Sequence, residues 1–297
     1  EKTQEKERLR EAMEAAVDYY RKNLRGGQGR RAMDYLRDRK IDEKTIDSFS
    51  LGYALPAWDG LLRSLGRERF KEGELVKAGL AVPRSGGGAI DRFRGRVLFP
   101  ITDAQGNPVA FGGRIIGEGE PKYLNSSETP LYHKSKVLYA FSEAREHVRK
   151  EGFGVVVEGY FDCLTAHQYG IGNVVATSGT ALTEGHLRLM QRYADRWTVV
   201  FDGDAAGIRA AKRSLELFVA QGLFARAVLL PEGEDPDSFI REKGPDAFRR
   251  LLDEAESLMD FFVRRTIEEH PVRTVEGKVA AVRELVPLLA KLRGKVE

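Results

Sequence analysis

From about residue 134 onward, short apolar segments alternate with segments of helical pattern, and this alternation constrains the fold more than any other feature of the sequence. The predicted strands are 154–157, 173–176, 197–201 and 225–230, and the predicted helices between them are 161–169, 183–193 and 205–221. Strands separated by helices form a parallel sheet that is covered on both faces. The sequence therefore predicts an α/β fold whose ligand site lies at the carboxyl ends of the strands.

The segments on either side of this α/β region have a different pattern. Residues 3–25 predict an amphipathic helix and 30–39 a short one, followed by irregular structure over 41–49. Segments 96–101 and 108–111 predict two strands around a turn. The last stretch, 246–297, has a helical pattern throughout. We therefore predict a basic mixed α/β domain over 1–133, a catalytic α/β domain over 134–245 and a helical segment over 246–297.

Composition restricts the class of protein. The chain has 297 residues, 42% of them hydrophobic, which suffices for a buried core and about two domains. Its single cysteine, Cys163, excludes an internal disulfide framework and a cysteine-rich zinc site. No apolar run approaches the roughly 20 residues that span a bilayer. The chain begins without Met and without an apolar leader, so we expect a trimmed fragment of a cytoplasmic protein.

Charge divides unevenly along the chain. Residues 1–150 contain 29 Lys and Arg against 22 Asp and Glu, a net of +7, whereas residues 151–297 contain 19 against 23, a net of −4. A basic half joined to an acidic half suggests that one holds a polyanion and the other holds cations. From charge alone, an ordinary solvated surface remains the favoured explanation.

Acidic residues follow three of the predicted strands. Glu158 and Asp162 come after the first, and Asp202 and Asp204 after 197–201. Asp235 and Asp237 come after the fourth. Because the carboxyl ends of parallel strands meet at one edge of a sheet, these carboxylates are expected to converge and to need a neutralising cation. Oxygen-only ligands favour Mg²⁺ or Mn²⁺ over zinc.

The spacing of these acids agrees with a shared site. In an extended segment, Asp202 and Asp204 point the same way, and Gly203 leaves room between them. For any single acid, a helix N-cap or a first-turn position is an equally good interpretation. Three acidic clusters at three strand ends favour the metal site.

The arrangement resembles the Toprim domain that topoisomerases, primases and some nucleases share. Four further motifs resemble the RNA-polymerase core of bacterial replicative DNA primases, and the resemblance covers nearly the whole chain. These motifs are residues 92–101 (RFRGRVLFPI), 112–114 (GGR), 121–129 (PKYLNSSET) and 158–162 (EGYFD). Three positions depart from the family pattern, namely Lys40, Ser127 and Phe161, and they affect local loop geometry without touching an acidic ligand.

The resemblance implies roles for particular residues. The catalytic metal-binding acids would be Glu158, Asp202 and Asp204. Asp162, Asp235 and Asp237 would complete the metal site. The residues that bind nucleotide or template would be Arg39, Arg94, Arg96, Arg114, Lys122, Asn125 and Lys134.

The function so implied is synthesis of short RNA primers during DNA replication. The enzyme would be a DNA-directed RNA polymerase that uses Mg²⁺, with Mn²⁺ as a substitute, and no zinc in this fragment. Its partners would be single-stranded DNA template, ribonucleoside triphosphates and the RNA–DNA hybrid product, with no membrane. The replicative helicase would bind through a C-terminal domain that we expect to be absent here, as we do the N-terminal zinc domain.

Other functions remain open at this point. The main alternative is another Toprim enzyme, a topoisomerase or a nuclease. A non-catalytic nucleic-acid-binding module is the second, although the intact acids count against it. A dehalogenase-type phosphatase would show a D-x-D-x-T motif, whereas Asp204 is followed by two alanines.

Overall fold

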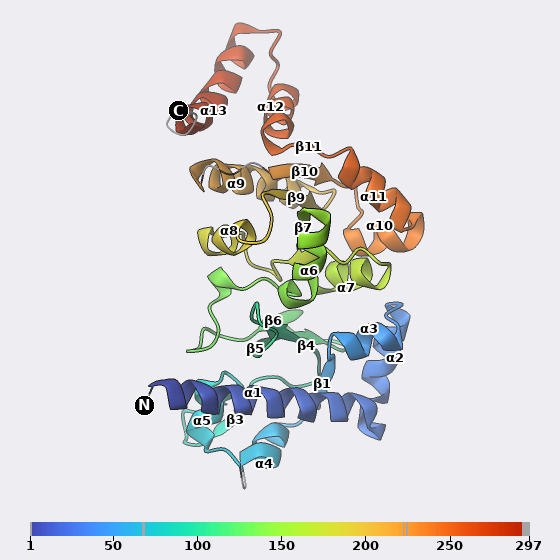
Figure 1. Cartoon of the computed structure of the whole chain (residues 1–297), viewed down its shortest axis with the longest axis vertical. Helices are drawn as coiled ribbons and strands as arrows, with labels where there is room; N and C mark the ends of the chain where they lie inside the picture. Colours follow the sequence, from blue (N-terminus) through green and yellow to red (C-terminus); the bar gives the residue numbers. More distant parts are fainter. Residues whose placement is uncertain (1, 67–68, 222, 224, 293–297) are drawn as a thin grey trace. The chain divides into compact units, whose positions relative to one another are not determined.

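The computed structural model describes residues 2–66, 69–221, 223 and 225–292 (Figure 1). The chain divides into two compact units, Glu1–Glu143 and Ala144–Glu297, called unit 1 and unit 2 below. The three-part division made from the sequence stays a prediction. No helix in the described ranges is long and apolar enough to cross a membrane.

Unit 1 begins with the predicted amphipathic helix. Helix α1 covers Lys2–Arg25, and its buried face carries Leu9, Met13 and Tyr20 at helical spacing. A 3₁₀ turn (η1, Gly27–Gly29) leads into α2, Arg30–Asp38. The irregular structure expected over 41–49 is wrong in part, because α3 forms over Glu43–Ser48. The Asp42 side chain caps α3 by accepting from the Thr45 N–H at 2.7 Å.

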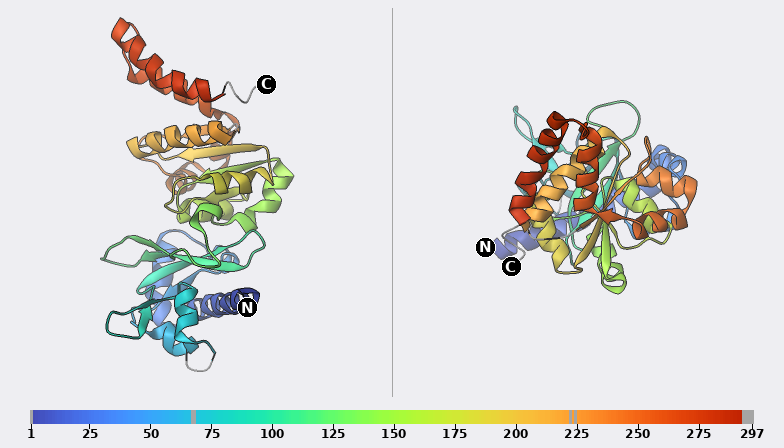
Figure 2. Two further views of the ribbon diagram at one scale, coloured as in Figure 1. Left: turned by 90° about the vertical axis from the view of Figure 1, so that its left-hand side faces the viewer. Right: turned by 90° about the horizontal axis from the view of Figure 1, so that it is seen from above.

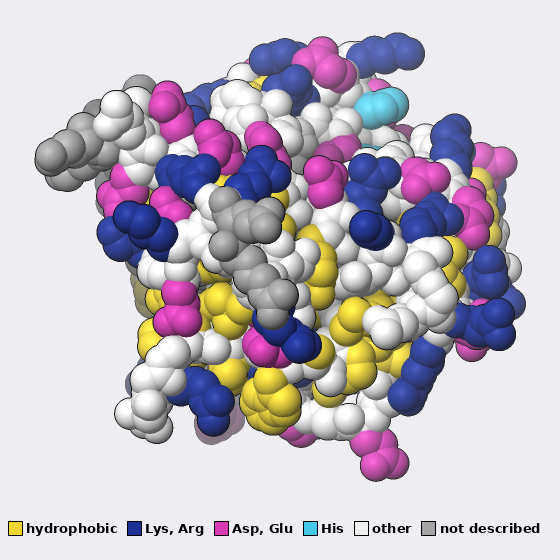
Figure 3. Space-filling model, turned by 90° about the horizontal axis from the view of Figure 1, so that it is seen from below, with side chains coloured by type: hydrophobic (Ala, Val, Ile, Leu, Met, Phe, Trp, Pro, Cys, Tyr) yellow, Lys and Arg dark blue, Asp and Glu magenta, His cyan; other side chains and the backbone are white. Residues whose placement is uncertain are grey.

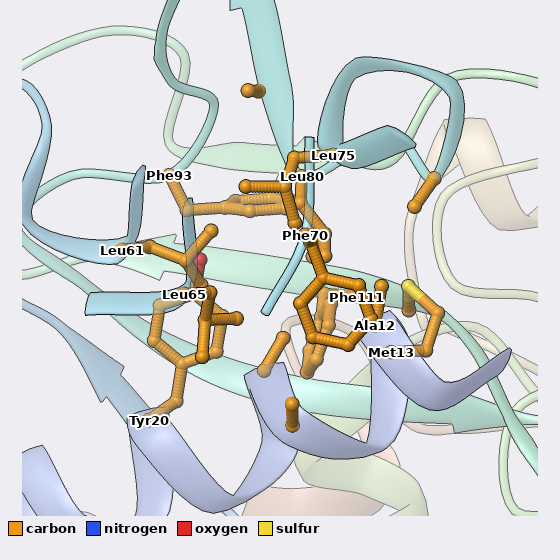
Figure 4. Close-up of a cluster of buried hydrophobic side chains, with 14 of the residues drawn as sticks. Ala12, Met13, Tyr20, Leu61, Leu65, Phe70, Leu75, Leu80, Phe93 and Phe111 are labelled. Carbon is orange, nitrogen blue, oxygen red and sulfur yellow. The ribbon is translucent and has the colours of Figure 1, made fainter. Parts of the chain in front are cut away.

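A four-stranded antiparallel sheet forms the centre of unit 1, in the order β1-β4-β5-β6. Its strands are β1 Gly52–Ala54, β4 Arg96–Thr102, β5 Pro108–Ile115 and β6 Tyr123–Asn125. The predicted pairing of β4 with β5 is confirmed, with Phe99 opposite Gly112. Tyr20 of α1 packs edge-on against Phe111 of β5, at 5.3 Å between ring centroids (Figure 4).

Short elements complete unit 1. They are α4 Gly60–Gly66, α5 Glu72–Lys77, β2 Ala81–Pro83, β3 Ala89–Asp91 and the 3₁₀ turn η2 Lys134–Lys136. Strands β2 and β3 pair antiparallel. Leu61, Leu65 and Leu75 from α4 and α5 join the same core as α1 (Figure 4).

Unit 2 contains the predicted α/β sheet, in the order β11-β10-β9-β7-β8. Its strands are β7 Phe153–Val157, β8 Val174–Ala176, β9 Arg196–Phe201, β10 Ala225–Leu229 and β11 Glu256–Ser257. The first four run parallel, as predicted. Strand β11 pairs antiparallel with β10, so the prediction of helix throughout 246–297 is wrong at this point.

Helices lie on both sides of these strands (Figure 2). The helices of this part of the chain are α6 Phe141–Glu151, α7 Tyr160–Gln168, α8 Glu184–Gln191, α9 Ala205–Gln221, α10 Pro236–Lys243, α11 Pro245–Asp253, α12 Leu258–Glu269 and α13 Val275–Leu292, the last of which packs on α9 and α12. The end of the predicted helical segment, 293–297, lies outside the described residues. The order strand, acidic loop, helix recurs at β7–α7, β9–α9 and β10–α10.

Candidate active site

Three acidic loops meet at the carboxyl end of the unit 2 sheet. Glu158 follows β7, Asp202 follows β9, and the 231–237 loop follows β10. Strands β7, β9 and β10 are adjacent and parallel, so their ends lie side by side. The three acidic loops therefore begin side by side at one edge of the sheet, as the sequence predicted.

Backbone contacts fasten the loop after β9 to the loop after β10. The Gly203 N–H donates to the Glu234 carbonyl at 3.1 Å, and the Gly233 N–H donates to the Gly203 carbonyl at 3.3 Å. A Cβ atom on Gly203 would lie only 1.8 Å from the Pro231 carbonyl oxygen. Gly203 thus permits a close backbone approach that holds the Asp202 and Asp235 loops together.

Asp162 joins the start of α7 to the start of α10. One of its carboxylate oxygens accepts from the Gly159 N–H at 2.8 Å, and the other accepts from the Asp237 N–H at 3.2 Å. Its side chain is buried. Both oxygens are therefore engaged in positioning the two loops.

The buried Asp237 carboxylate forms an ion pair with an arginine of the same helix, α10. The side chain is 1% exposed, and Arg241, one helical turn later, donates Nε to Oδ1 at 3.0 Å and Nη2 to Oδ2 at 3.2 Å. The Thr165 hydroxyl of α7 also donates to Oδ1, at 2.7 Å. Asp237 thereby anchors α7 to α10, and Arg241 neutralises its charge.

Two of the acids also cap helices. Asp204 accepts from the Gly207 N–H at the start of α9 at 2.7 Å, and Asp235 accepts from the Ser238 N–H at the start of α10 at 2.7 Å. The capping role that the sequence left open therefore applies to both. In each case the capping bond is accepted by Oδ1 of the carboxylate.

The carboxylates raise one another's pKa values. Burial, followed by repulsion from Glu158, Asp235 and Asp204, raises the pKa of Asp202 to about 7. Burial and then Asp235 and Asp202 raise the pKa of Asp162 to about 8, even though its backbone hydrogen bonds act in the opposite direction. The pKa of Glu158 is raised by burial and by Asp204. These acids thus form one electrostatic cluster of excess negative charge.

Within the described part of the chain, no three His, Cys, Asp or Glu side chains are arranged as ligands around a single metal position. The chemistry of the cluster nevertheless suits a hard divalent cation, because its donors are carboxylate oxygens that repel one another. One further observation agrees with a bound cation. The buried Asp202 Oδ1 has no hydrogen-bond partner among the described residues, and neither does Glu234 Oε2.

The predicted arginines of unit 1 differ in accessibility. Arg96 is buried, and its guanidinium donates to the carbonyls of Gly113, Pro121 and Lys122 at 3.2, 2.8 and 3.4 Å. It therefore fixes the segment that joins β5 to β6. Arg114 is partly exposed and lies over the rings of Tyr35 and Tyr123, at 5.8 and 5.4 Å from their centroids.

The other predicted binding residues lie at different places in unit 1. Lys122 is exposed, and the carbonyl of Asn125 accepts from the Arg92 guanidinium at 2.7 Å. Lys134 is partly buried, and its N–H donates to the Glu128 carboxylate at 2.8 Å. Arg39 ends α2, with its N–H bonded to the Tyr35 carbonyl at 3.1 Å.

Sequence reasoning missed the residues that support the acids. Arg241 neutralises Asp237, and their i, i+4 spacing in a helix was the available signal. Glu234 belongs to the acidic 232–237 run, but only the tertiary structure shows its backbone bond to Gly203. Thr165 carried no sequence signal.

Three protein-family models match successive parts of the chain. The N-terminal domain of the DNA primase catalytic core matches residues 19–145, and a Toprim-like model matches residues 155–240. The DnaB-helicase binding domain of primase matches residues 259–297. The expectation that a helicase-binding domain is absent from this chain is therefore wrong, since the final helices match one.

Individual relatives agree with these matches. The DNA primase of Pseudomonas putida is 42% identical over 95% of this chain, which covers 44% of that protein. The DNA primase of Escherichia coli K12 is 34% identical over 98% of the chain, covering 51% of that protein. The chain thus spans about half the length of the curated relatives it matches.

Solved structures are similar along almost the whole chain. A DNA primase domain from Pseudomonas aeruginosa has a TM-score of 0.90 at 41% identity, and the match covers 96% of this chain and 90% of that one. The DnaG primase catalytic domain bound to single-stranded DNA has a TM-score of 0.87 at 34% identity, covering 98% of this chain and 94% of that one. Toprim domains are typically Mg²⁺-dependent, which agrees with the oxygen-only acids of unit 2.

Proposed function

This chain belongs to the family of bacterial DnaG-type primase catalytic cores with a Toprim domain, and from that premise we propose that it joins ribonucleotides on a single-stranded DNA template. The observation that carries the proposal is the carboxylate cluster at the ends of β7, β9 and β10, with a buried Asp202 oxygen that lacks a partner. The reaction would be attack of a ribose hydroxyl on an α-phosphate, with loss of pyrophosphate.

Glu158, Asp202 and Asp204 are the residues that would hold Mg²⁺, or Mn²⁺ in its place. Bound divalent cations stabilise the negative charge on the attacking and leaving oxygens of a phosphoryl group. Asp235 is placed to contribute from the neighbouring loop. Asp162 and Asp237 accept hydrogen bonds that hold α7 and α10, and the remaining lone pairs of their carboxylates would complete the site for a second ion.

The residues of unit 1 would bind the polyanions. Exposed Lys122 and partly exposed Arg114, Arg94 and Lys134 suit contact with phosphates of template, triphosphate or hybrid product. Arg39 and Asn125 belong to the same predicted surface. Buried Arg96 would act by fixing the backbone on either side of Pro121.

The proposal also covers a partner protein and the cellular compartment. The replicative helicase is the partner that the match over residues 259–297 supports, so α12 and α13 are where we expect it to bind. Because a primase acts on chromosomal DNA, we expect the protein to work in the cytoplasm.

Synthesis and cleavage assays distinguish this function from the alternatives. The chain should produce short RNA, or extend a primer, when given single-stranded DNA, ribonucleoside triphosphates and Mg²⁺, and it should leave the DNA uncut. Cleavage without synthesis would favour a nuclease or a topoisomerase. Binding without either reaction would favour a non-catalytic module.

A further inference from the structure

Two arginines lie on the same exposed face of α9. Arg209 and Arg213 are four residues apart, so their side chains are neighbours on the helix surface. Among the described residues, neither guanidinium has a hydrogen-bond or ion-pair partner. Like charges at this spacing repel each other, so an anion bound between them would stabilise this face of the helix.

The direction of Arg213 follows from the residue before it. Lys212 points toward α12 and α13, because its Nζ donates to Glu269 at 2.9 Å and to Glu284 at 2.7 Å. The next residue of a helix lies about 100° further round the axis. Arg213 therefore points away from α12 and α13, and it takes no part in the contacts that join these helices to α9.

Arg213 acts on the acidic loops at the start of α9. The helix begins directly after Asp204, at the carboxyl end of the sheet, and long helical side chains lean toward the N-terminus of their helix. Burial and then Asp204 raise the pKa of Glu158, and the positive charge of Arg213 acts in the opposite direction. The Arg213 guanidinium is thus close enough to influence Glu158, yet it keeps its N–H donors available to a ligand.

The surroundings make this arginine unusual. Lys and Arg are frequent on unit 1, as the face at its α4 end shows (Figure 3). Unit 2 has 22 Lys and Arg against 24 Asp and Glu, a net of −2. Its Arg241 also lies beside the acids, but two hydrogen bonds engage it with Asp237. Arg213 is beside the same cluster without such a partner among the described residues.

We propose that Arg213 binds the β- and γ-phosphates of the ribonucleoside triphosphate next to Glu158 and stabilises the pyrophosphate as it leaves. A guanidinium offers paired N–H donors that match two oxygens of a phosphate. The inference rests on the proposed function, because it assigns a residue to the substrate of that reaction.

The reaction explains why a cation is useful at this position. The ribose 3′-oxygen forms a bond to the α-phosphorus, and its proton passes to water. The bond from that phosphorus to the oxygen bridging to the β-phosphate breaks, and its electron pair leaves with the pyrophosphate. Negative charge therefore grows on the leaving group, where a positioned guanidinium stabilises the transition state.

A comparison of ATP with AMP isolates the contact. Binding is measured by isothermal titration calorimetry with Mg²⁺ and without template. Arg213→Gln should weaken ATP binding by about 10- to 150-fold, the range for hydrogen bonds to a charged group. AMP binding should stay unchanged, because AMP lacks the β- and γ-phosphates. Arg213→Lys should retain part of the ATP affinity, since it keeps the charge but loses the paired donors.

Arg250→Gln is the matched control. Arg250 is an exposed arginine of α11, and its neighbour Arg249 donates to the carbonyl of Gly170, which precedes β8 at the opposite end of the sheet. This variant should bind ATP and AMP as the wild type does. Because Arg213 and Arg250 are both exposed, all three variants are expected to fold with the wild-type unfolding temperature.

The kinetics and the metal affinity complete the test. In RNA synthesis, Arg213→Gln should raise the KM for nucleotide and lower kcat, because the contact strengthens as the pyrophosphate leaves. Its affinity for Mn²⁺ should stay unchanged. If Arg213→Gln bound ATP as the wild type does, the proposal would be rejected.

Two other outcomes have separate meanings. Equal losses of ATP, AMP and Mn²⁺ binding would also overturn the proposal, because Arg213 would then act only through Glu158. If the wild type bound ATP but made no RNA, the proposed function would fail. The comparison of ATP with AMP would still decide whether Arg213 contacts the phosphates.

Discussion

At the residue scale, Asp202 is the carboxylate on which the metal assignment depends most. Asp202→Asn keeps the shape of the side chain but removes one of the two charges of the Asp-Gly-Asp pair, which weakens a hard-cation site. We expect RNA synthesis to fall by at least about 100-fold, the order seen when one group that stabilises transition-state charge is lost. Bound Mn²⁺, measured by electron paramagnetic resonance, should fall as well.

Asp195→Asn is the matched control for this substitution. Asp195 is exposed and lies just before the opposite end of β9, away from the carboxyl edge of the sheet. It should retain synthesis, Mn²⁺ binding and the wild-type unfolding temperature, whereas Asp202→Asn should unfold at the same temperature or higher, because it removes a buried charge that its neighbours repel. Wild-type synthesis by Asp202→Asn would remove Asp202 from the site.

His167 gives a prediction about pH. Its Nε2–H donates to the Val174 carbonyl at 2.8 Å, and burial lowers the pKa of the ring to about 4. The unfolded chain, with a His pKa near 6.5, therefore binds more protons between pH 6.5 and pH 4. The contribution of His167 to stability should fall as the pH falls through this window, by up to about 3 kcal/mol, and change little above it.

Urea unfolding at several pH values checks this effect. His167→Gln cannot take up the proton, so the difference in free energy of unfolding between this variant and the wild type should change across the same window, in favour of the variant at the lower pH. His133→Gln changes an exposed ring and should keep the wild-type profile. Parallel profiles for the wild type and His167→Gln would show that His167 does not carry the dependence.

At the scale of elements, the loops after β9 and β10 are expected to act as one structure. Gly203→Ala places a methyl group where the Pro231 carbonyl already lies, so the two loops must separate. Overpacking of this kind costs roughly 1–3 kcal/mol. We expect lower stability in urea unfolding and a loss of synthesis, because Asp202 and Asp235 move apart.

The control is a glycine with open space around it. A Cβ atom on Gly73, in α5, would meet nothing within 4 Å, so Gly73→Ala should leave stability unchanged or slightly raised. If Gly203→Ala were as stable and active as Gly73→Ala, the loops would not need this close approach.

At the scale of the whole molecule, the prediction concerns whether lysines of unit 1 bind the template or the triphosphate on which the carboxylates of unit 2 act. Replacing both Lys122 and Lys134 with Ala removes two positive charges from unit 1. If they contact template phosphates, the affinity for single-stranded DNA should fall, and its log–log salt dependence should become shallower by about 0.7 per contact. If they hold the triphosphate, the apparent KM for nucleotide should rise instead.

Measuring both quantities in the one double variant decides between these roles. Lys44 and Lys71 offer a matched pair of exposed lysines from the same unit outside the family motifs. Their double replacement should affect both quantities less. No difference between the two double variants would leave Lys122 and Lys134 as ordinary surface charges.

The sequence by itself determined the α/β order of unit 2 and the positions of its acids. Both depend on local patterns, since short apolar runs rich in β-branched residues favour strands and the acids follow these runs directly. The pairing of β4 with β5 followed in the same way from a short turn. The alternation could not reveal β11, because a two-residue strand has no periodicity and forms only through its pairing with β10.

The tertiary structure alone decided how the acids are used. The Thr165 hydroxyl donates to Asp237, and Asp162 accepts from the Asp237 N–H, across sequence separations that no local pattern encodes. It also showed that Arg96 is buried while Trp58 is exposed. Residue type biases a side chain toward core or surface, but its burial depends on which elements pack around it, and that is fixed only when distant segments of the chain come together.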